Sequence, residues 1–168
     1  LDASEVVFAG FGIVAPEYDW DDYEGIDVKG KTVLVMINDP GFKSGDPTFF
    51  KGDQMTYYGR WTYKFEEAAR QGAAGIMIIH ETEAAGYPWA VLENSGSSAN
   101  LTLDDPNRLP TCNIQGWITQ QAAVKFFQFS GKDMNQEMTM AGTRNFRPVD
   151  LSVRIWFDMD LVIKKDVS

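Results

Sequence analysis

Cysteine and histidine are scarce in this chain, which contains one of each, Cys112 and His80. A single cysteine cannot form a disulfide within the chain, so cysteine usage does not indicate the redox compartment. A catalytic zinc ion takes about three protein ligands, typically with histidine among them. Unless a site is built from carboxylates alone, the sequence lacks the ligands of a hydrolytic zinc centre. We therefore expect no catalytic residue, metal ligand or cofactor in this segment.

Positive charge and long apolar runs are also in short supply. The chain has 15 Lys and Arg residues against 24 Asp and Glu residues, a net charge of -9. That charge repels phosphate groups and anionic lipids, so nucleic acid and membrane are not expected partners. No apolar run approaches the ~20 residues of a bilayer span. The chain begins at Leu1 without a signal-peptide pattern, and we interpret it as a segment excised from a longer protein.

The hydrophobic content is sufficient for a core. Hydrophobic residues fill 44% of the 168 positions, which predicts one domain, 1–168, of mixed α/β class. Apolar and alternating runs predict strands over 5–14, with bends at Gly10 and Gly12, and over 32–38, 76–80, 112–118 and 151–161. Helices are expected from about 56 to Gly72 and over 120–131 after the cap Thr119, with a short helical turn near 133–138. The intervals 39–53 and 81–109 read as loops, with a weak strand signal over 89–93.

The first predicted helix has a periodic apolar stripe. Positions spaced i, i+4, i+7 and i+8 lie on one helical face, and here they are Trp61, Phe65, Ala68 and Ala69. Glu66 and Arg70, four residues apart, are expected to pair on a more exposed face.

Two motifs suggest ligands but lack the surroundings that those ligands need. GFGIVA, from Gly10 to Ala15, matches the spelling of a dinucleotide fingerprint. That fingerprint requires a helix to begin inside it, which Pro16 and the acidic loop after it prevent, so a bulged strand is favoured. The acidic loop does not fit the calcium-loop pattern either, because the sixth position counted from Asp19 is Glu24 rather than glycine. We interpret the loop as a solvated acidic face.

A thiol hydrolase using Cys112 and His80 is one alternative function. Such enzymes place a cysteine and a histidine side by side. A lone histidine at the end of an apolar strand is more often a hydrogen-bonded structural residue, and no nucleophile elbow of the G-x-S-x-G type is present.

Aromatic residues are abundant in and beside the loops, including Tyr18, Trp20, Tyr23, Tyr57, Tyr58, Trp61, Tyr63, Tyr87 and Trp89. Tyrosine and tryptophan bury much area at low entropic cost and dominate interface energetics. They indicate either a contact face or a cover over the core, and the sequence leaves both readings open.

The stretch KFEEAARQGAAGIMIIHET, preceded by MTYYGRWTY and followed by AGYPW, resembles the protease-associated domain inserted in two-zinc metallo-aminopeptidases. That family includes bacterial leucine-type aminopeptidases, glutamate carboxypeptidase and the transferrin receptor. The stretch from VFAGFGIVAPEYDWDDYEG to DVKGKTVLVMINDPGF is similar to the same insertion. The resemblance covers about 6–117 and implies an open β-barrel or sandwich of about seven strands flanked by two main helices.

The resemblance also implies a function. The two zinc ions would belong to a separate catalytic domain of the same chain, with this noncatalytic domain as a lid or interaction domain over the cleft. It implies a secreted or periplasmic protein, and a face that contacts either peptide substrate or only the neighbouring domain. We expect that face to comprise Tyr58, Arg60, Trp61, Tyr87 and Trp89. A free-standing peptide-binding or sorting module is the other alternative.

Overall fold

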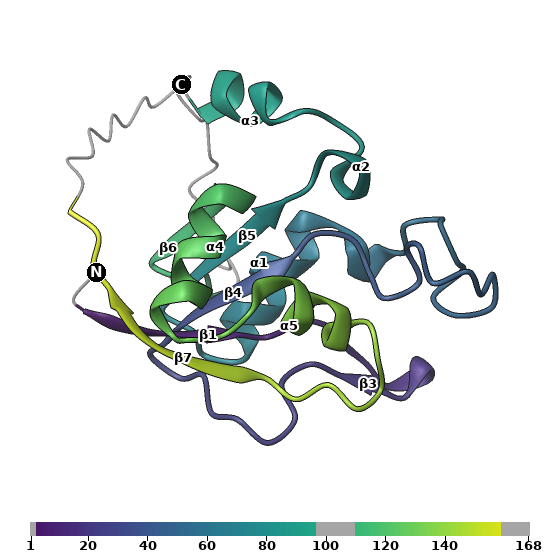
Figure 1. Ribbon diagram of the computed structural model, residues 1–168, viewed down its shortest axis with the longest axis horizontal. Coiled ribbons are helices and arrows are strands. Elements are labelled where there is room, and N and C mark those ends of the chain that lie inside the picture. Colours follow the sequence, from purple (N-terminus) through teal and green to yellow (C-terminus); the bar gives the residue numbers. More distant parts are fainter. Residues whose placement is uncertain (1–2, 97–109, 159–168) are drawn as a thin grey trace, which may run out of the picture.

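The computed structural model describes residues 3–96 and 110–158 (Figure 1). Seven strands are found in this part: β1 (Ser4–Phe8), β2 (Val14–Ala15), β3 (Trp20–Asp21), β4 (Thr32–Met36), β5 (Gly75–His80), β6 (Ile114–Thr119) and β7 (Val149–Ile155). The helices in it are α1 (Trp61–Arg70), α2 (Thr82–Ala85), α3 (Trp89–Gly96), α4 (Gln120–Phe129) and α5 (Met134–Ala141), with short 3-10 turns at Pro16–Tyr18 and Tyr57–Gly59.

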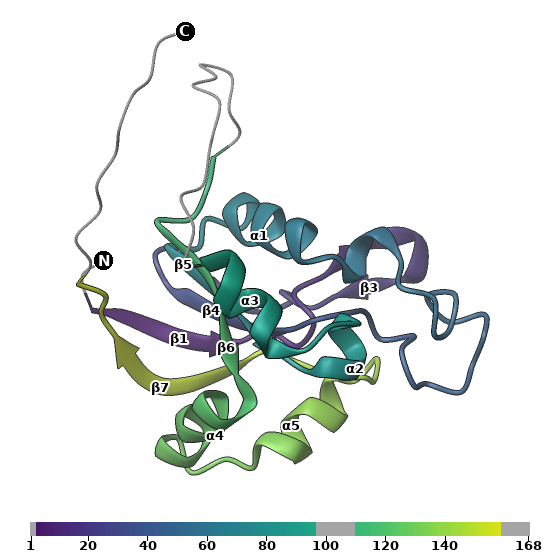
Figure 2. The same ribbon diagram turned by 90° about the horizontal axis from the view of Figure 1, so that it is seen from above.

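Five strands form one open sheet in the order β6-β5-β4-β1-β7, while β2 and β3 form a separate two-stranded ribbon. Strands β1, β4, β5 and β6 are parallel, and β7 runs antiparallel to β1. Parallel neighbours need crossover connections, which cover the faces of a sheet with helices. Figure 2 shows α1 on one side of this sheet and α4 and α5 on the other.

The central strands are apolar on both faces because both faces are covered. In β4, Leu34 and Met36 join a core cluster with Phe127 of α4, while Val33 and Val35 join a second cluster with Ala68 of α1. Alternate residues of β1 and β5 divide between the same two clusters. The sheet thus separates two hydrophobic cores and contributes side chains to both.

The expected barrel or sandwich does not form within the described residues. The α/β class is confirmed, but the strands make an open mixed sheet and a small ribbon, with five α-helices rather than two main ones. Only α1 and α4 have ten residues. The sheet is open because its outer strands, β6 and β7, pair with β5 and β1 and not with each other, and the crossovers between the parallel strands place helices over both faces.

Two strand predictions were wrong. The strand predicted over 5–14 ends at Phe8, because Gly10 and Gly12 adopt left-handed φ values of 52° and 64° and turn the chain. The segment 89–93, predicted as a weak strand, lies in α3, where the Trp89 indole donates to Glu93 one helical turn later. The last strand runs over Val149–Ile155, and predicted strand positions 159–161 lie outside the described residues.

The buried face of α1 differs from the predicted stripe. Ala68 is buried as expected, but Trp61 is 45% exposed, and Tyr63, Lys64 and Glu67 are buried instead. Their polar atoms are paired, which offsets the cost of burial. The Glu66–Arg70 pair forms at 3.9 Å between Nη1 and Oε2. The other helix predictions are confirmed: the Thr119 hydroxyl accepts from the Ala122 N–H to cap α4, and α5 extends the predicted short turn.

Among the helices of the described residues, none is long and apolar enough to cross a membrane.

Candidate functional site: an aromatic groove beside the outer strand

A groove of about 650 Å³ lies between α1, α3 and β6. Its wall is largely aromatic, and we call it the aromatic groove, defined by Trp61, Phe65, Tyr87, Trp89 and Trp117. The aliphatic side chains of Val91 and Leu92 add to it. Residues far apart in sequence therefore build one apolar hollow, the form that peptide side chains and small apolar ligands require.

Each aromatic anchor is held by its own element. Trp61 opens α1 and packs edge-to-face on Phe65 one turn later, with ring centroids 5.5 Å apart. Trp89 opens α3, and its indole donates to Glu93 Oε1 at 2.9 Å. Trp117 comes from β6. These contacts limit the freedom of the rings before any partner arrives, which lowers the entropic cost of binding.

His80 fixes the segment that carries two of these rings. Its Nε2 lies 3.0 Å from the Tyr87 carbonyl oxygen, and its ring centroid is 5.6 Å from that of Trp89 and 6.0 Å from that of Trp117. The side chain is buried at the end of β5. The prediction that His80 is a hydrogen-bonded structural residue is confirmed, and its structural role is to support the groove.

Three of the five predicted contact residues line the groove and two do not. Trp61, Tyr87 and Trp89 meet there. Tyr58 faces elsewhere, because its hydroxyl donates to Glu17 Oε1 at 2.6 Å. That hydrogen bond, with partial burial, raises the pKa of Tyr58 to about 12. The exposed Arg60 precedes α1, and its side chain makes no hydrogen bond or ion pair within the described residues.

The structure separates Cys112 from His80. His80 pairs with Thr119 at one end of the β5–β6 ladder, whereas Cys112 precedes the other end, where Gly75 pairs with Ile114. At about 3.3 Å per residue the two lie roughly 20 Å apart along the sheet. Cys112 is buried, and burial raises the pKa of its thiol to about 11. Among the described residues His80 does not lie beside the thiol, so the alternative of a thiol hydrolase that uses Cys112 and His80 is wrong.

The glycine turn of the GFGIVA motif surrounds the carboxyl group of a residue of the same chain, Asp22. Asp22 is fully buried, and its Oδ2 accepts from the main-chain N–H groups of Phe11 at 3.1 Å and Ile13 at 3.0 Å. Burial raises the pKa of this carboxyl to about 7, against the lowering effect of these donors and of the nearby Trp20 indole. The indole N–H falls short of hydrogen-bond geometry. The motif is thus a turn around an internal carboxylate, and the prediction of a bulged strand there was wrong.

The other acidic side chains of this loop serve as local partners. Asp21 accepts from the main-chain N–H of Tyr23, Asp19 faces Arg144, and Glu24 pairs with Arg147 at 3.1 Å. The predicted solvated acidic face is therefore partly engaged in contacts with the segment after α5. Within the described residues, no group of three or more His, Cys, Asp or Glu side chains is arranged to hold a metal ion.

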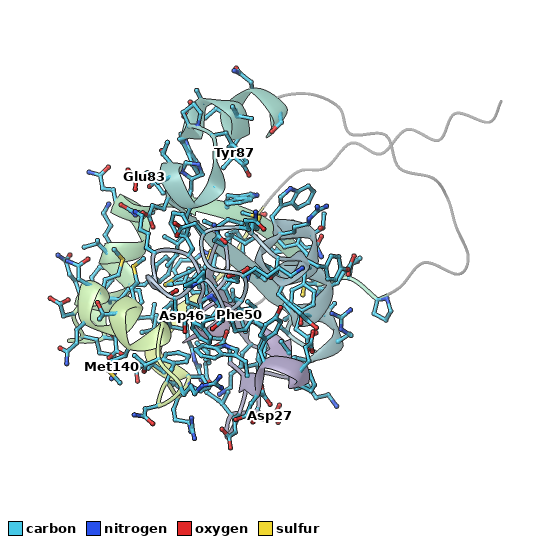
Figure 3. The ribbon with its side chains drawn as sticks, turned by 90° about the vertical axis from the view of Figure 1, so that its right-hand side faces the viewer. Asp27, Asp46, Phe50, Glu83, Tyr87 and Met140 are labelled. Atoms are coloured by element: carbon cyan, nitrogen blue, oxygen red, sulfur yellow. The ribbon has the colours of Figure 1, made fainter. Side chains whose placement is uncertain are left out.

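A second cavity, also about 650 Å³, lies where β4 and β5 end. We call it the strand-end cavity. Its apolar wall includes Phe11, Phe42 and Phe49, and its polar groups include Lys43 and Glu81. The Lys43 ammonium bridges Glu81 and Glu83. Figure 3 shows Glu83 and Tyr87 at the end of the molecule that carries α2 and α3, and Asp46 and Phe50 in the loop facing the viewer.

Sequence reasoning missed this cavity, although a signal was present. The polar Glu81, which lines the cavity, follows β5 directly, and Lys43 and Asp46 of the lining come in the loop after β4. Polar residues at neighbouring ends of parallel strands meet at the same edge of an open α/β sheet, where ligands commonly bind.

Comparison of the chain with protein-family models, with curated proteins and with solved structures gives no match.

Proposed function

We propose that this chain is a noncatalytic protease-associated domain of a zinc-dependent aminopeptidase, and that the aromatic groove is its contact face. In this proposal the domain lies over the catalytic cleft of a peptidase domain in the same chain and takes part in substrate selection. The two zinc ions belong to that catalytic domain, and no residue of this chain is assigned to them. The parent protein would be secreted or periplasmic.

One observation carries the proposal: Trp61, Tyr87 and Trp89, chosen from the sequence as contact residues, come from separate segments and line one groove. Tryptophan and tyrosine are the residues that most often dominate binding energy at protein interfaces. The hydrogen bond between His80 and the Tyr87 carbonyl fixes the segment that carries Tyr87 and Trp89. A free-standing peptide-binding module would use the same groove, so the two functions differ in the partner and not in the surface.

The first test is catalytic. The pure 168-residue chain is incubated with leucine p-nitroanilide, with and without added zinc, and release of nitroaniline is followed. We expect no turnover above the buffer rate in either condition. Turnover by the purified chain would contradict a noncatalytic domain. Sequencing the gene on both sides is the companion test, and it should reveal a peptidase domain with histidine and carboxylate ligands for two zinc ions.

The second test concerns the groove. In a chain that includes the flanking peptidase domain, Trp61→Ala and Trp89→Ala should lower kcat/KM for apolar peptide substrates by about tenfold, in the range seen for anchor residues. Phe129→Ala is the matched control, because Phe129 is an aromatic residue on α4 that is 81% exposed and lies outside the groove. Equal activity of all three variants would exclude the groove as a substrate contact.

A further inference from the structure

Strand β6 is an outer strand of the sheet and differs from its neighbours in exposure. It pairs with β5 on one side only. All residues of β4 and β5 are buried, whereas no residue of β6 is. An outer strand presents unpaired main-chain N–H and C=O groups, and natural proteins usually cover such an edge or place charge on it. The strand itself, IQGWIT, carries no charged residue.

The pairing shows which main-chain groups face outward. The Gly75 N–H donates to the Lys31 carbonyl beside β4, so the main-chain groups of Gly75 face β4 and those of its parallel partner Ile114 face β5. The Ile114 N–H accordingly points to the Ala74 carbonyl at 3.4 Å, which it shares with the Asn113 N–H at 2.8 Å just before the strand. Main-chain groups alternate sides along a strand, so those of Ile114, Gly116 and Ile118 face β5. The N–H and C=O groups of Gln115 and Trp117 therefore point away from the sheet. Within 3–96 and 110–158, β6 pairs with β5 alone, and these outward groups make no other main-chain hydrogen bond.

The same edge opens into the aromatic groove. Gln115, Gly116 and Trp117 all line it, although side chains of successive strand residues point to opposite faces. A Cβ placed on Gly116 would meet nothing within 4 Å. The groove is thus bordered by the backbone of β6 and by the rings of α1 and α3. A ligand in the groove can reach donors and acceptors of the strand and an apolar hollow at once.

We propose that the outer edge of β6 takes up an extended peptide as an added strand, with one apolar side chain of that peptide in the aromatic groove. This inference deepens the proposed function, on which it rests, by naming the form in which a peptide is bound. The outward groups of Gln115 and Trp117 repeat every second residue, the spacing of another extended chain and not of a helix. The net charge of -9 and Glu93 at the groove favour a peptide with basic residues beside its apolar centre.

The test uses the peptide acetyl-Lys-Thr-Val-Thr-Leu-Thr-Val-Thr-Lys-amide with a fluorophore on one lysine, followed by fluorescence anisotropy. A second peptide has the same side chains but N-methyl groups on the central Leu and on both Val residues, which removes the donors of one edge. A third carries N-methyl groups on the two Thr residues beside the Leu, for the opposite edge. We expect the wild-type chain to bind the unmodified peptide and to bind one of the methylated peptides roughly tenfold more weakly.

Protein variants test the same pairing from the other side. Gln115→Pro removes an outward N–H and leaves the bonds to β5 in place, because proline is tolerated in an edge strand where its nitrogen faces solvent. Gln115→Val is the matched control, since it changes the side chain and keeps the N–H. Gln115→Pro should bind the unmodified peptide about tenfold more weakly than Gln115→Val, a comparison in which both variants lack the glutamine side chain and only one lacks the N–H.

The outcomes separate the two proposals. Equal binding of all three peptides would overturn strand addition, and a loss of binding in Trp61→Ala would then still support the groove as a contact face. No saturable binding of the unmodified peptide would also overturn strand addition, whereas the proposed function is judged by the nitroaniline assay and the flanking gene sequence. If Gln115→Pro lacks the near-ultraviolet circular dichroism of the wild type, the methylated peptides on the wild-type chain decide.

Discussion

At the scale of single residues, the most unusual feature is a pair of fully buried ionisable side chains, Asp22 and Lys64. Lys64 Nζ donates to the Asn38 carbonyl oxygen at 2.7 Å, and burial lowers the pKa of this ammonium to about 7. Asp22 is held by the glycine turn, and burial raises its pKa to about 7. Each group ties an irregular segment to the core: Lys64 the end of β4, and Asp22 the turn after β1.

The raised pKa of Asp22 predicts a pH dependence of stability. Between the unfolded value of 3.8 and the folded value of about 7, the folded chain binds more protons than the unfolded chain. The free energy of unfolding therefore falls as pH rises through this window. From pH 5 to pH 7 the loss attributable to Asp22 is about 2 kcal/mol. Urea unfolding of wild type and Asp22→Asn over this range measures it.

In Asp22→Asn the amide oxygen can still accept from the N–H groups of Phe11 and Ile13, but no proton is taken up. The variant should lack the decline in unfolding free energy that the wild type shows. Asp27→Asn is the control, because Asp27 lies at the exposed end of the same loop and accepts only from Lys29 in its own turn. Parallel pH profiles for wild type and Asp22→Asn would rule out a raised pKa at this carboxyl.

At the scale of structural elements, the long loop between β4 and α1 is closed by one buried carboxylate. Asp39 Oδ1 accepts from the Gly41 N–H at 3.0 Å. Its Oδ2 accepts from the N–H of Thr56 at 2.9 Å and from the Thr56 hydroxyl at 2.7 Å. A single side chain thus joins the two ends of the loop that forms part of the strand-end cavity.

Asp39→Ala should release the loop without unfolding the sheet. It leaves buried N–H groups without partners, which costs about 1–3 kcal/mol for each group. Lys43 and Lys51 are already exposed, and the local opening frees the main chain beside them to enter the active site of trypsin. We expect cleavage in the loop to be at least about tenfold faster than in wild type. Asp46→Ala is the control, since within the described residues the Asp46 carboxylate accepts from the N–H and the hydroxyl of Thr48, inside the loop, and does not join its two ends. Equal cleavage rates in wild type and Asp39→Ala would show that Asp39 does not close the loop.

Elements whose signals are local could be predicted from the sequence. The apolar run of β5 and the cap of α4 at Thr119 need only neighbouring residues to be recognised. The prediction failed where distant groups decide the conformation. Strand β1 ends at Phe8 because the turn after it encloses Asp22, which follows β3 and lies more than ten residues further along the chain. The buried face of α1 includes Lys64 because its partner, the Asn38 carbonyl, lies at the end of β4.

The candidate site was predictable in part for the same reason. Trp61, Tyr87 and Trp89 could be chosen because large aromatic residues near loops often form contact faces. Tyr58 could not be separated from them, since its partner Glu17 lies far away in sequence. The contribution of β6 was not predictable either, because the place of a strand at the edge of a sheet follows from the order of all the strands.

At the scale of the whole molecule, the two core clusters share strands β1, β4 and β5. Loss of packing in one cluster therefore destabilises the strands against which the other cluster packs. This arrangement predicts that the described cores unfold together in one cooperative transition. Cys112 is a suitable reporter for one face, because it is buried in the cluster beneath α1. Phe127 of α4 belongs to the opposite cluster.

Phe127→Ala should therefore increase the reactivity of Cys112 across the sheet. Removing a buried phenylalanine costs about 3 kcal/mol or more, and Phe127 is fully buried against Phe8. If Cys112 is labelled only after global unfolding, its rate of reaction with a thiol reagent under native conditions rises about 100-fold. Phe129→Ala is the matched control on the same helix, where the ring is exposed, and it should label at the wild-type rate. A wild-type rate in Phe127→Ala as well would mean that the face carrying Cys112 opens by itself, and that the sheet does not couple its two cores.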